Sequence, residues 1–274
     1  MTDLGPFDLH GPEFLQLYSA LSVIAVIACL AIPPFLRPDG RAARPADEDE
    51  LALLAGGRDR FAEAVAVRLL SAGRATVEGT LGLRIRDQRG GGTLAERRIV
   101  AMPSPVTWKH VTEALAGPAE ASERQLEAKG LLLDGATTLQ LRLLQSAPLL
   151  LLFAFGAAKW IIGTMRDRPV DYLSVLLVLT AIAALLRFAV HDRRTRAGQQ
   201  AVATARAQAA RLRRAAPTDE AALAVALFGT SVLAGSYLSD FHRMRAANGG
   251  GDSGSSGGDG GSGCGGGGCG GCGG

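Results

Sequence analysis

The sequence predicts a mainly α-helical, multi-span membrane protein with a small cytosolic helical domain and a disordered Gly/Cys-rich tail. Two apolar runs, 143–163 and 172–190, are each about 20 residues long, which lets a helix cross the ~30 Å hydrocarbon core of a bilayer. A third such run covers residues 14–36. The mean hydropathy of +0.18 is typical of a chain that combines a few spans with polar segments.

The first run, 14–36, is predicted to be an uncleaved transmembrane helix that follows an external N-terminus, 1–13. A signal peptide begins with basic residues, whereas residues 1–13 contain three acids and no Lys or Arg. Residues 26–29 fit a loose lipoprotein cleavage pattern, but the apolar run continues past Cys29, where a mature lipoprotein would turn polar. We therefore interpret Cys29 as a small apolar side chain inside a membrane helix.

Arginine predicts the orientation of the spans. The linker 37–45 contains three arginines, and the segment 191–216 contains seven with Asp192 as its only acid. Basic flanks mark the cytoplasmic side of a membrane, so the N-terminus should lie outside and residues 37–142 inside. The abundance of Ala and Gly and the use of Arg over Lys are typical of a GC-rich bacterium. These features predict a multi-pass protein of the bacterial inner (cytoplasmic) membrane.

The cytosolic region 46–142 is predicted to be helical and winged-helix-like. An acidic helix start at 47–50 and the glycines at 56–57 delimit one helix, and apolar spacing predicts a second over 58–71. Over residues 76–86, apolar and polar side chains alternate as in a short β-hairpin.

This pattern partly recurs in the second half of the region. Helices are expected near 106–115 and 120–129, and residues 131–141 would form a second ribbon. The region could thus hold a tandem pair of modules, 46–89 and 103–142.

A winged helix that binds DNA needs a basic recognition helix. The second helices here, 58–71 and 120–129, are mixed in charge or acidic. Nucleic acid is therefore not the expected partner. We expect the domain to bind a protein partner, and membrane-tethered transcriptional control is a weaker alternative.

Two further segments follow the third span. Residues 191–216 are predicted to form a basic cytosolic helix, whose arginines would be attracted to the lipid of an anionic membrane surface. Residues 221–238 are apolar, but they are rich in Ala and interrupted by Gly229 and Gly235. We expect this segment to pack on the domain, while a fourth span and a re-entrant segment stay open. The choice decides on which side of the membrane the tail lies.

The tail, 249–274, is a low-complexity Gly/Ser/Cys segment that is expected to be disordered. Cys264, Cys269 and Cys272 form a C-x4-C-x2-C pattern, and thiolates at such spacing can bind Zn or Cu. A closed site needs four ligands, and no fourth Cys or His lies nearby. We therefore expect no cofactor, with Zn or Cu at these cysteines as an alternative in which the protein is a thiol-dependent metal or redox carrier.

No catalytic motif is present in the sequence. The four histidines are scattered, and the serine-hydrolase, zinc-protease and nucleotide-binding patterns do not occur. The spans also lack the paired acids of a transport pathway. The function predicted from sequence is therefore non-enzymatic, namely anchoring a cytosolic partner-binding domain to the membrane.

Several short motifs occur in a characteristic order along the chain. They are Glu-Leu-Ala-Leu-Leu-Ala-Gly-Gly at 50–57, Gly-Leu-Leu-Leu at 130–133, Arg-Thr-Arg-Ala-Gly at 194–198 and the segment 225–229, followed by the Gly/Cys tail. In this order the chain resembles, over essentially its whole length, a family of uncharacterised bacterial membrane proteins with a Gly/Cys-rich C-terminal tail. The resemblance implies the same topology and brings no known activity.

Overall fold

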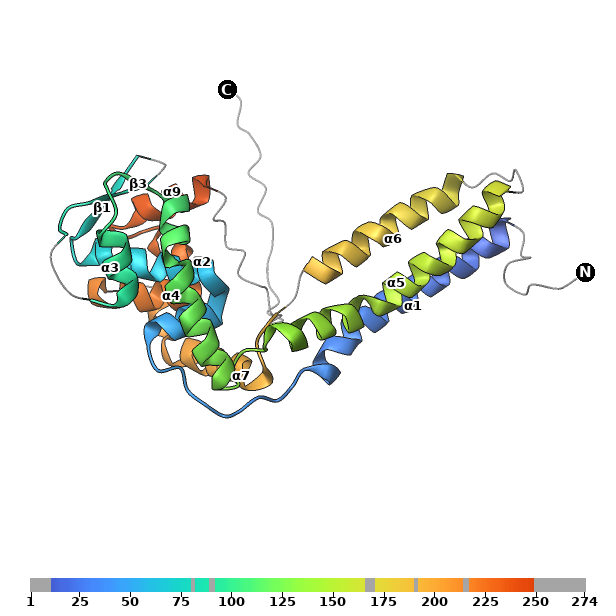
Figure 1. Cartoon of the computed structure of the whole chain (residues 1–274), viewed down its shortest axis with the longest axis horizontal. Coiled ribbons are helices and arrows are strands. Elements are labelled where there is room, and N and C mark those ends of the chain that lie inside the picture. The colour runs from blue at the N-terminus through green and yellow to red at the C-terminus, as the bar shows by residue number, and fades with distance from the viewer. Residues whose placement is uncertain are drawn as a thin grey trace, which may run out of the picture.

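The protein is divided into a helical bundle at one end and a domain at the other (Figure 1). The structure is a computed structural model and describes residues 11–79, 82–88, 92–165, 171–189, 192–213 and 217–248. Most of these residues are helical, as the sequence predicts. Residues 1–10 and the tail 249–274 lie outside the described residues. The disorder expected for the tail therefore stays a prediction.

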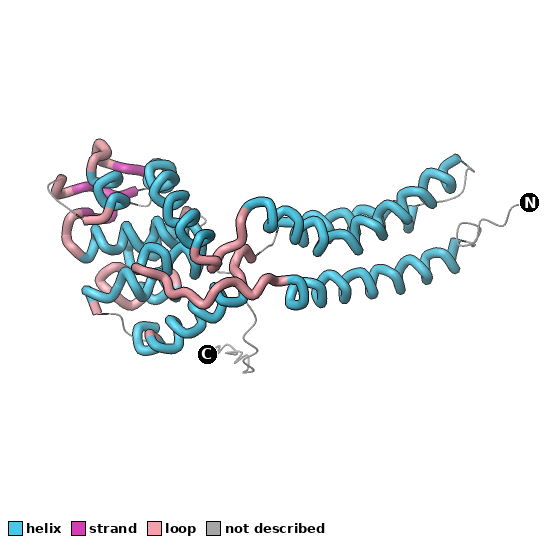
Figure 2. The backbone as a smooth tube through the Cα atoms, turned by 60° about the horizontal axis from the view of Figure 1, so that its bottom comes forward, coloured by secondary structure: helices cyan, strands magenta, loops and turns pink. Residues whose placement is uncertain are grey.

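The bundle consists of α1 (Gly11–Leu36), α5 (Gly135–Met165) and α6 (Asp171–Ala189). Each of these helices is long and apolar enough to cross a membrane, which confirms the three predicted apolar helices. The start of α1, the end of α5 and the start of α6 lie at the end of the bundle remote from the domain (Figures 1 and 2). All three helices therefore meet the domain at the other end, which we term the domain side.

Tyr18 holds the three helices of the bundle together. Its side chain is fully buried, and its hydroxyl lies 3.1 Å from the Thr180 hydroxyl of α6. Gly156 of α5 lies beside the tyrosine ring, where an added Cβ would be only 2.6 Å from a ring carbon. A glycine at this position lets α1 and α5 approach closely, as small residues do in membrane helix packing.

Helix α5 starts eight residues earlier than the apolar run at Leu143 predicts. Residues 137–141 were expected in a second β-ribbon, and they are helical instead. Asp134 explains the difference, because its carboxylate accepts a hydrogen bond from the Thr137 amide at 3.3 Å and so caps a helix start. The hydroxyl and amide of Thr137 also hold the pKa of Asp134 below its ordinary value.

The first half of the domain follows the predicted order of two helices and a hairpin. Helix α2 (Glu48–Ser71) is kinked at Gly56 and Gly57, where Gly57 has a φ of +72°, a left-handed conformation that favours glycine. Strands β1 (Ala75–Glu78) and β2 (Gly82–Ile85) then pair antiparallel, with Thr76 opposite Arg84. Helix α3 (Leu94–Val100) and strand β3 (Val106–Thr107), which extends the sheet beside β2, were not predicted.

The second half of the region does not repeat this pattern. The two helices predicted at 106–115 and 120–129 form a single helix, α4 (Trp108–Ala128), which runs through Pro118. Pro118 is buried against the core, which offsets the hydrogen bond that a proline removes from a helix. Since no second ribbon follows α4, the prediction of tandem modules was wrong.

The C-terminal part of the described chain completes the domain. The predicted basic helix is shorter than the segment 191–216, because α7 covers Arg196–Gln208 and a 3₁₀ turn, η2, covers Ala210–Arg213. Helix α8 (Ala221–Phe228) is almost wholly buried against α2. The apolar segment 221–238 thus packs in the domain, as expected, and is not among the helices long enough to span a membrane. The remaining elements are η3 (Thr218–Glu220), η4 (Thr230–Leu233) and α9 (Ser239–Ala247).

Candidate functional site

The candidate site is a polar junction between the bundle and the domain. It consists of three segments, 37–41, 130–133 and 192–199, each of which connects a helix of the bundle to the domain. Segment 37–41 follows α1, segment 130–133 precedes α5, and segment 192–199 follows α6. We refer to these three segments together as the junction.

The segments next to α5 and α6 pair with each other like two short strands. Leu132 and Arg194 form an antiparallel bridge. The Leu133 amide donates to the Arg193 carbonyl at 2.8 Å, and the Thr195 amide donates to the Leu131 carbonyl at 3.1 Å. The segments that flank α5 and α6 are therefore joined to each other by backbone hydrogen bonds where they enter the domain.

The segment that follows α1 is bound to the same place. Its carbonyls at Pro38 and Asp39 accept hydrogen bonds from the amides of Arg196 and Ala197, at 3.1 and 2.9 Å. These two amides are among the first of α7, which have no partner inside the helix. The Arg196 guanidinium also pairs with the Asp39 carboxylate at 2.8 Å. Helix α7 is thus capped by the chain that leaves α1.

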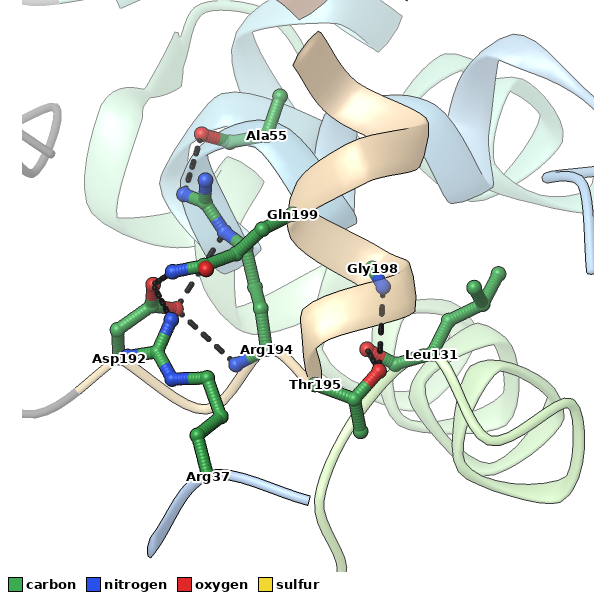
Figure 3. A network of polar contacts seen from close by, with 8 residues as sticks. All are labelled: Arg37, Ala55, Leu131, Asp192, Arg194, Thr195, Gly198 and Gln199. Atoms are coloured by element: carbon green, nitrogen blue, oxygen red, sulfur yellow. Dashed lines mark hydrogen bonds and ion pairs between the residues drawn. The ribbon is translucent and has the colours of Figure 1, made fainter. Parts of the chain in front are cut away.

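Asp192 is the centre of the side-chain network (Figure 3). One carboxylate oxygen accepts from Arg37 at 3.2 Å and from Gln199 at 2.9 Å. The other accepts from the Arg194 amide at 3.0 Å and lies 3.5 Å from the Arg194 Nε. This single acid therefore binds the exit of α1, the exit of α6 and the first turns of α7.

Arg194 extends the network into the domain (Figure 3). Its Nη2 donates to the Ala55 carbonyl at 2.8 Å, directly before the kink of α2. Carbonyls at the end of a helical segment lack intrahelical donors, so the guanidinium supplies one here. Burial lowers the pKa of Arg194, and the neighbouring Asp192 opposes that shift.

Thr195 and Gly198 pack the centre of the junction. The Thr195 hydroxyl donates to the Gly130 carbonyl at 2.9 Å and accepts from the Gly198 amide at 3.1 Å, which caps α7. A Cβ on Gly198 would lie 2.3 Å from the Leu131 carbonyl oxygen. Because that oxygen belongs to the backbone, it cannot move aside as a flexible side chain would.

We expect Gly198→Ala to destabilise the protein much more than Gly117→Ala does. Both glycines lie in helices, but a Cβ at Gly117 would meet nothing within 4 Å. Overpacking costs about 1–3 kcal/mol. At Gly117 the gain of about 0.5–1 kcal/mol that alanine has over glycine in a helix is opposed by the restriction that Pro118 places on the residue before it, so the net change should be small. Thermal unfolding of the two purified full-length variants measures this difference. An equal loss of melting temperature in the two variants would contradict the packing described here.

Helix α4 also binds the junction. Arg193 pairs with Glu127 at 3.1 Å and with Glu123 at 3.6 Å. Glu123 accepts a bidentate hydrogen bond from Arg58, whose Nε and Nη2 each lie 2.8 Å from a carboxylate oxygen. This bond, with the positive charges of Arg58 and Arg193, holds the pKa of Glu123 below its ordinary value.

Within the bundle, Arg187 connects α6 to α1 next to the junction. Its Nε and Nη2 donate to the Cys29 carbonyl at 3.3 and 3.2 Å. In a regular helix that oxygen accepts from the amide of residue 33, but this residue is a proline and has no N–H. Arg187 supplies the missing donor. The Cys29 side chain is buried among apolar neighbours, consistent with its sequence interpretation.

The predicted metal ligands are not part of this site. Cys264, Cys269 and Cys272 lie outside the described residues. Within the part of the chain that the structure describes, no group of three His, Cys, Asp or Glu side chains could hold a metal ion. Searches with this chain against protein-family models, curated proteins and solved structures gave no match.

The sequence pointed to the junction only indirectly. Asp192 stands out as the one acid in a basic segment, and the motif 194–198 supplies most of the remaining contacts. The partners of these residues lie about 60 to 160 positions away along the chain. No periodicity connects such distant positions, so the network becomes visible only in the fold.

Proposed function

We propose that this chain is a non-enzymatic protein of the bacterial inner membrane that holds a cytosolic partner-binding domain against the membrane. The observation that carries the proposal is the junction, where all three membrane helices are bound to the domain. Asp192 contacts the segments that follow α1 and α6. The bridge between Leu132 and Arg194 joins the segment that precedes α5. Such an arrangement serves to position a domain.

The proposed orientation has the N-terminus outside and the domain in the cytoplasm. It is supported by the position of the arginine-rich segments, since 37–45 and 192–213 both lie on the domain side of the bundle (Figure 1). Arginine-rich flanks stay on the cytoplasmic side during membrane insertion.

The partner is proposed to be a protein bound by the winged-helix-like first half of the domain. The helix that would enter a DNA groove, 58–71, has nearly all of its side chains from Arg60 to Leu70 buried. A recognition helix needs an exposed face to reach bases, so this burial favours a protein partner over DNA. Among the described residues of the domain, the exposed large apolar side chains are Leu94 and Tyr237, with exposed fractions of 54% and 58%. Exposed apolar side chains of this kind are candidates for a protein contact.

Photo-crosslinking in the native membrane tests this proposal. A photoreactive amino acid is placed at Leu94, at Tyr237 or, as a control, at Leu186, which is 61% exposed on α6 and would face lipid. We expect a discrete protein adduct from at least one domain position and none from Leu186. Absence of adducts from both domain positions, at normal expression, would contradict the proposal.

The same crosslinking experiment distinguishes the proposed function from the alternative that relies on the cysteines of the tail. Under the proposed function, replacing Cys264, Cys269 and Cys272 together with serine should leave the adduct unchanged. A thiol-dependent metal or redox carrier would instead lose metal uptake with this variant. Zinc and copper measured in the purified protein, before and after the change, give the second readout.

A further inference from the structure

Arg142 lies where α5 crosses the domain-side boundary of the bundle. Its guanidinium carbon is 6.0 Å from the centre of the Phe188 ring. Phe188 precedes the last residue of α6, a helix of 19 residues and therefore about 28 Å long. Because that length matches the hydrocarbon thickness of a bilayer, Phe188 and Arg142 lie at the level of the lipid headgroups.

The surroundings of Arg142 are apolar and open to lipid. Its neighbours Leu143 and Leu144 on α5 have exposed fractions of 50% and 44%. These side chains are too exposed to belong to a protein core, so in a membrane they contact lipid. Arg142, which is itself partly exposed, thus lies at the edge of a lipid-facing surface.

Arg142 lacks a partner for its buried donor. Its Nε is shielded from solvent and has no hydrogen-bond partner among the described residues. The nearest acid before it, Asp134, caps α5, and the nearest acid after α6, Asp192, already binds Arg37 and Arg194. The domain-side halves of α5 and α6 contain Arg142 and Arg187 and no acid, so this region has a net positive charge.

An unpaired guanidinium next to an apolar surface is costly, and a phosphate is the anion whose geometry its planar donors match. We infer that Arg142 binds the phosphate of an anionic phospholipid in the domain-side leaflet through the amino groups at the end of its guanidinium, with Leu143 and Leu144 against the acyl chains. The surplus of positive charge favours a lipid with net negative charge over a zwitterionic one. The inference depends on the membrane placement of α5 and not on the identity of any protein partner.

Lipid retention by the purified full-length protein tests the inference. The protein is placed in nanodiscs of equal phosphatidylglycerol and phosphatidylcholine, released into detergent, and its bound lipids are counted by native mass spectrometry. We expect the wild type to retain phosphatidylglycerol over phosphatidylcholine by about tenfold, the effect of one charge-assisted hydrogen-bond pair. Arg142→Gln should bring the ratio near one.

Arg98→Gln is the matched control, since Arg98 is exposed on α3, on the side of the domain remote from the bundle (Figure 1). It should retain lipid like the wild type. If Arg142→Gln does not fold, Arg142→Lys keeps the charge and should still favour phosphatidylglycerol. The inference is overturned if Arg142→Gln retains the wild-type ratio, if a folded Arg142→Lys shows no preference, or if millimolar inorganic phosphate displaces the lipid.

Discussion

The Asp192→Ala variant should keep a folded bundle and a folded domain but loosen the connection between them. Removing this carboxylate leaves the half-buried Arg37 and Arg194 without their shared anion and Gln199 without its acceptor. Breaking a largely buried ion pair on one side costs about 3 kcal/mol. The effect should concentrate on the first turn of α7, because Asp192 also binds the Arg194 amide directly before it.

Hydrogen–deuterium exchange of residues 194–199 measures this loosening. A cost of about 3 kcal/mol corresponds to an exchange rate that is roughly 100-fold faster. Asp192→Asn keeps an oxygen for the Arg194 amide and should give an intermediate rate. Asp240→Ala serves as the control, since Asp240 pairs with Arg243 only on the exposed surface of α9. Unchanged exchange in Asp192→Ala would show that the network does not hold the junction together.

The second large effect is expected from Glu63→Ala in the core of the domain. Glu63 is buried and accepts a hydrogen bond from the buried Arg245 at 2.9 Å. Its other oxygen lies 3.8 Å from Arg60, which is also buried. Truncating the acid would leave two guanidiniums in the core with no carboxylate between them. Such changes cost about 3–5 kcal/mol.

Trp108 reports this change directly. The Arg245 guanidinium lies over its ring at 4.1 Å, and the chain contains only one other tryptophan, Trp160. In a Trp160→Phe background, fluorescence therefore follows the environment of Trp108 during urea unfolding. We expect a large drop in the unfolding midpoint for Glu63→Ala and none for Glu120→Ala, which removes only an exposed pair with Arg124. Equal midpoints for the two variants would refute a stabilising role of the Glu63 pair.

The apolar helices were predictable because their signal is local. A run of about 20 apolar residues is sufficient to identify α1 and α6, and glycines at 56–57 and 73 mark real ends or kinks in the domain. The start of α5 was not predicted, because the alternation of residues 137–141 concealed a helix that Asp134 caps. The two helices expected near 106–115 and 120–129 are one, α4, because Pro118 between them is buried in the core.

The junction was beyond sequence reasoning for a different reason. Its contacts join residues that are distant in the chain, such as Arg37 with Asp192 and Arg194 with Ala55. A single arginine in a basic segment has the same local appearance whether it faces solvent, lipid or a helix end. Only the fold distinguishes Arg194, which is bound to the end of a helical segment, from the exposed Arg213 a few turns later.

The three connections between bundle and domain have a mechanical consequence. A domain attached by one flexible linker can rotate freely. A domain attached at three separate points rotates only when the helices that hold it move. A change in the tilt of α5 or α6 would therefore act on the domain as on a lever, through Arg194 and the kink of α2 at Gly57. In a membrane that the bundle crosses, the thickness of the bilayer, which is one determinant of helix tilt, would thereby influence the orientation of the domain relative to the membrane.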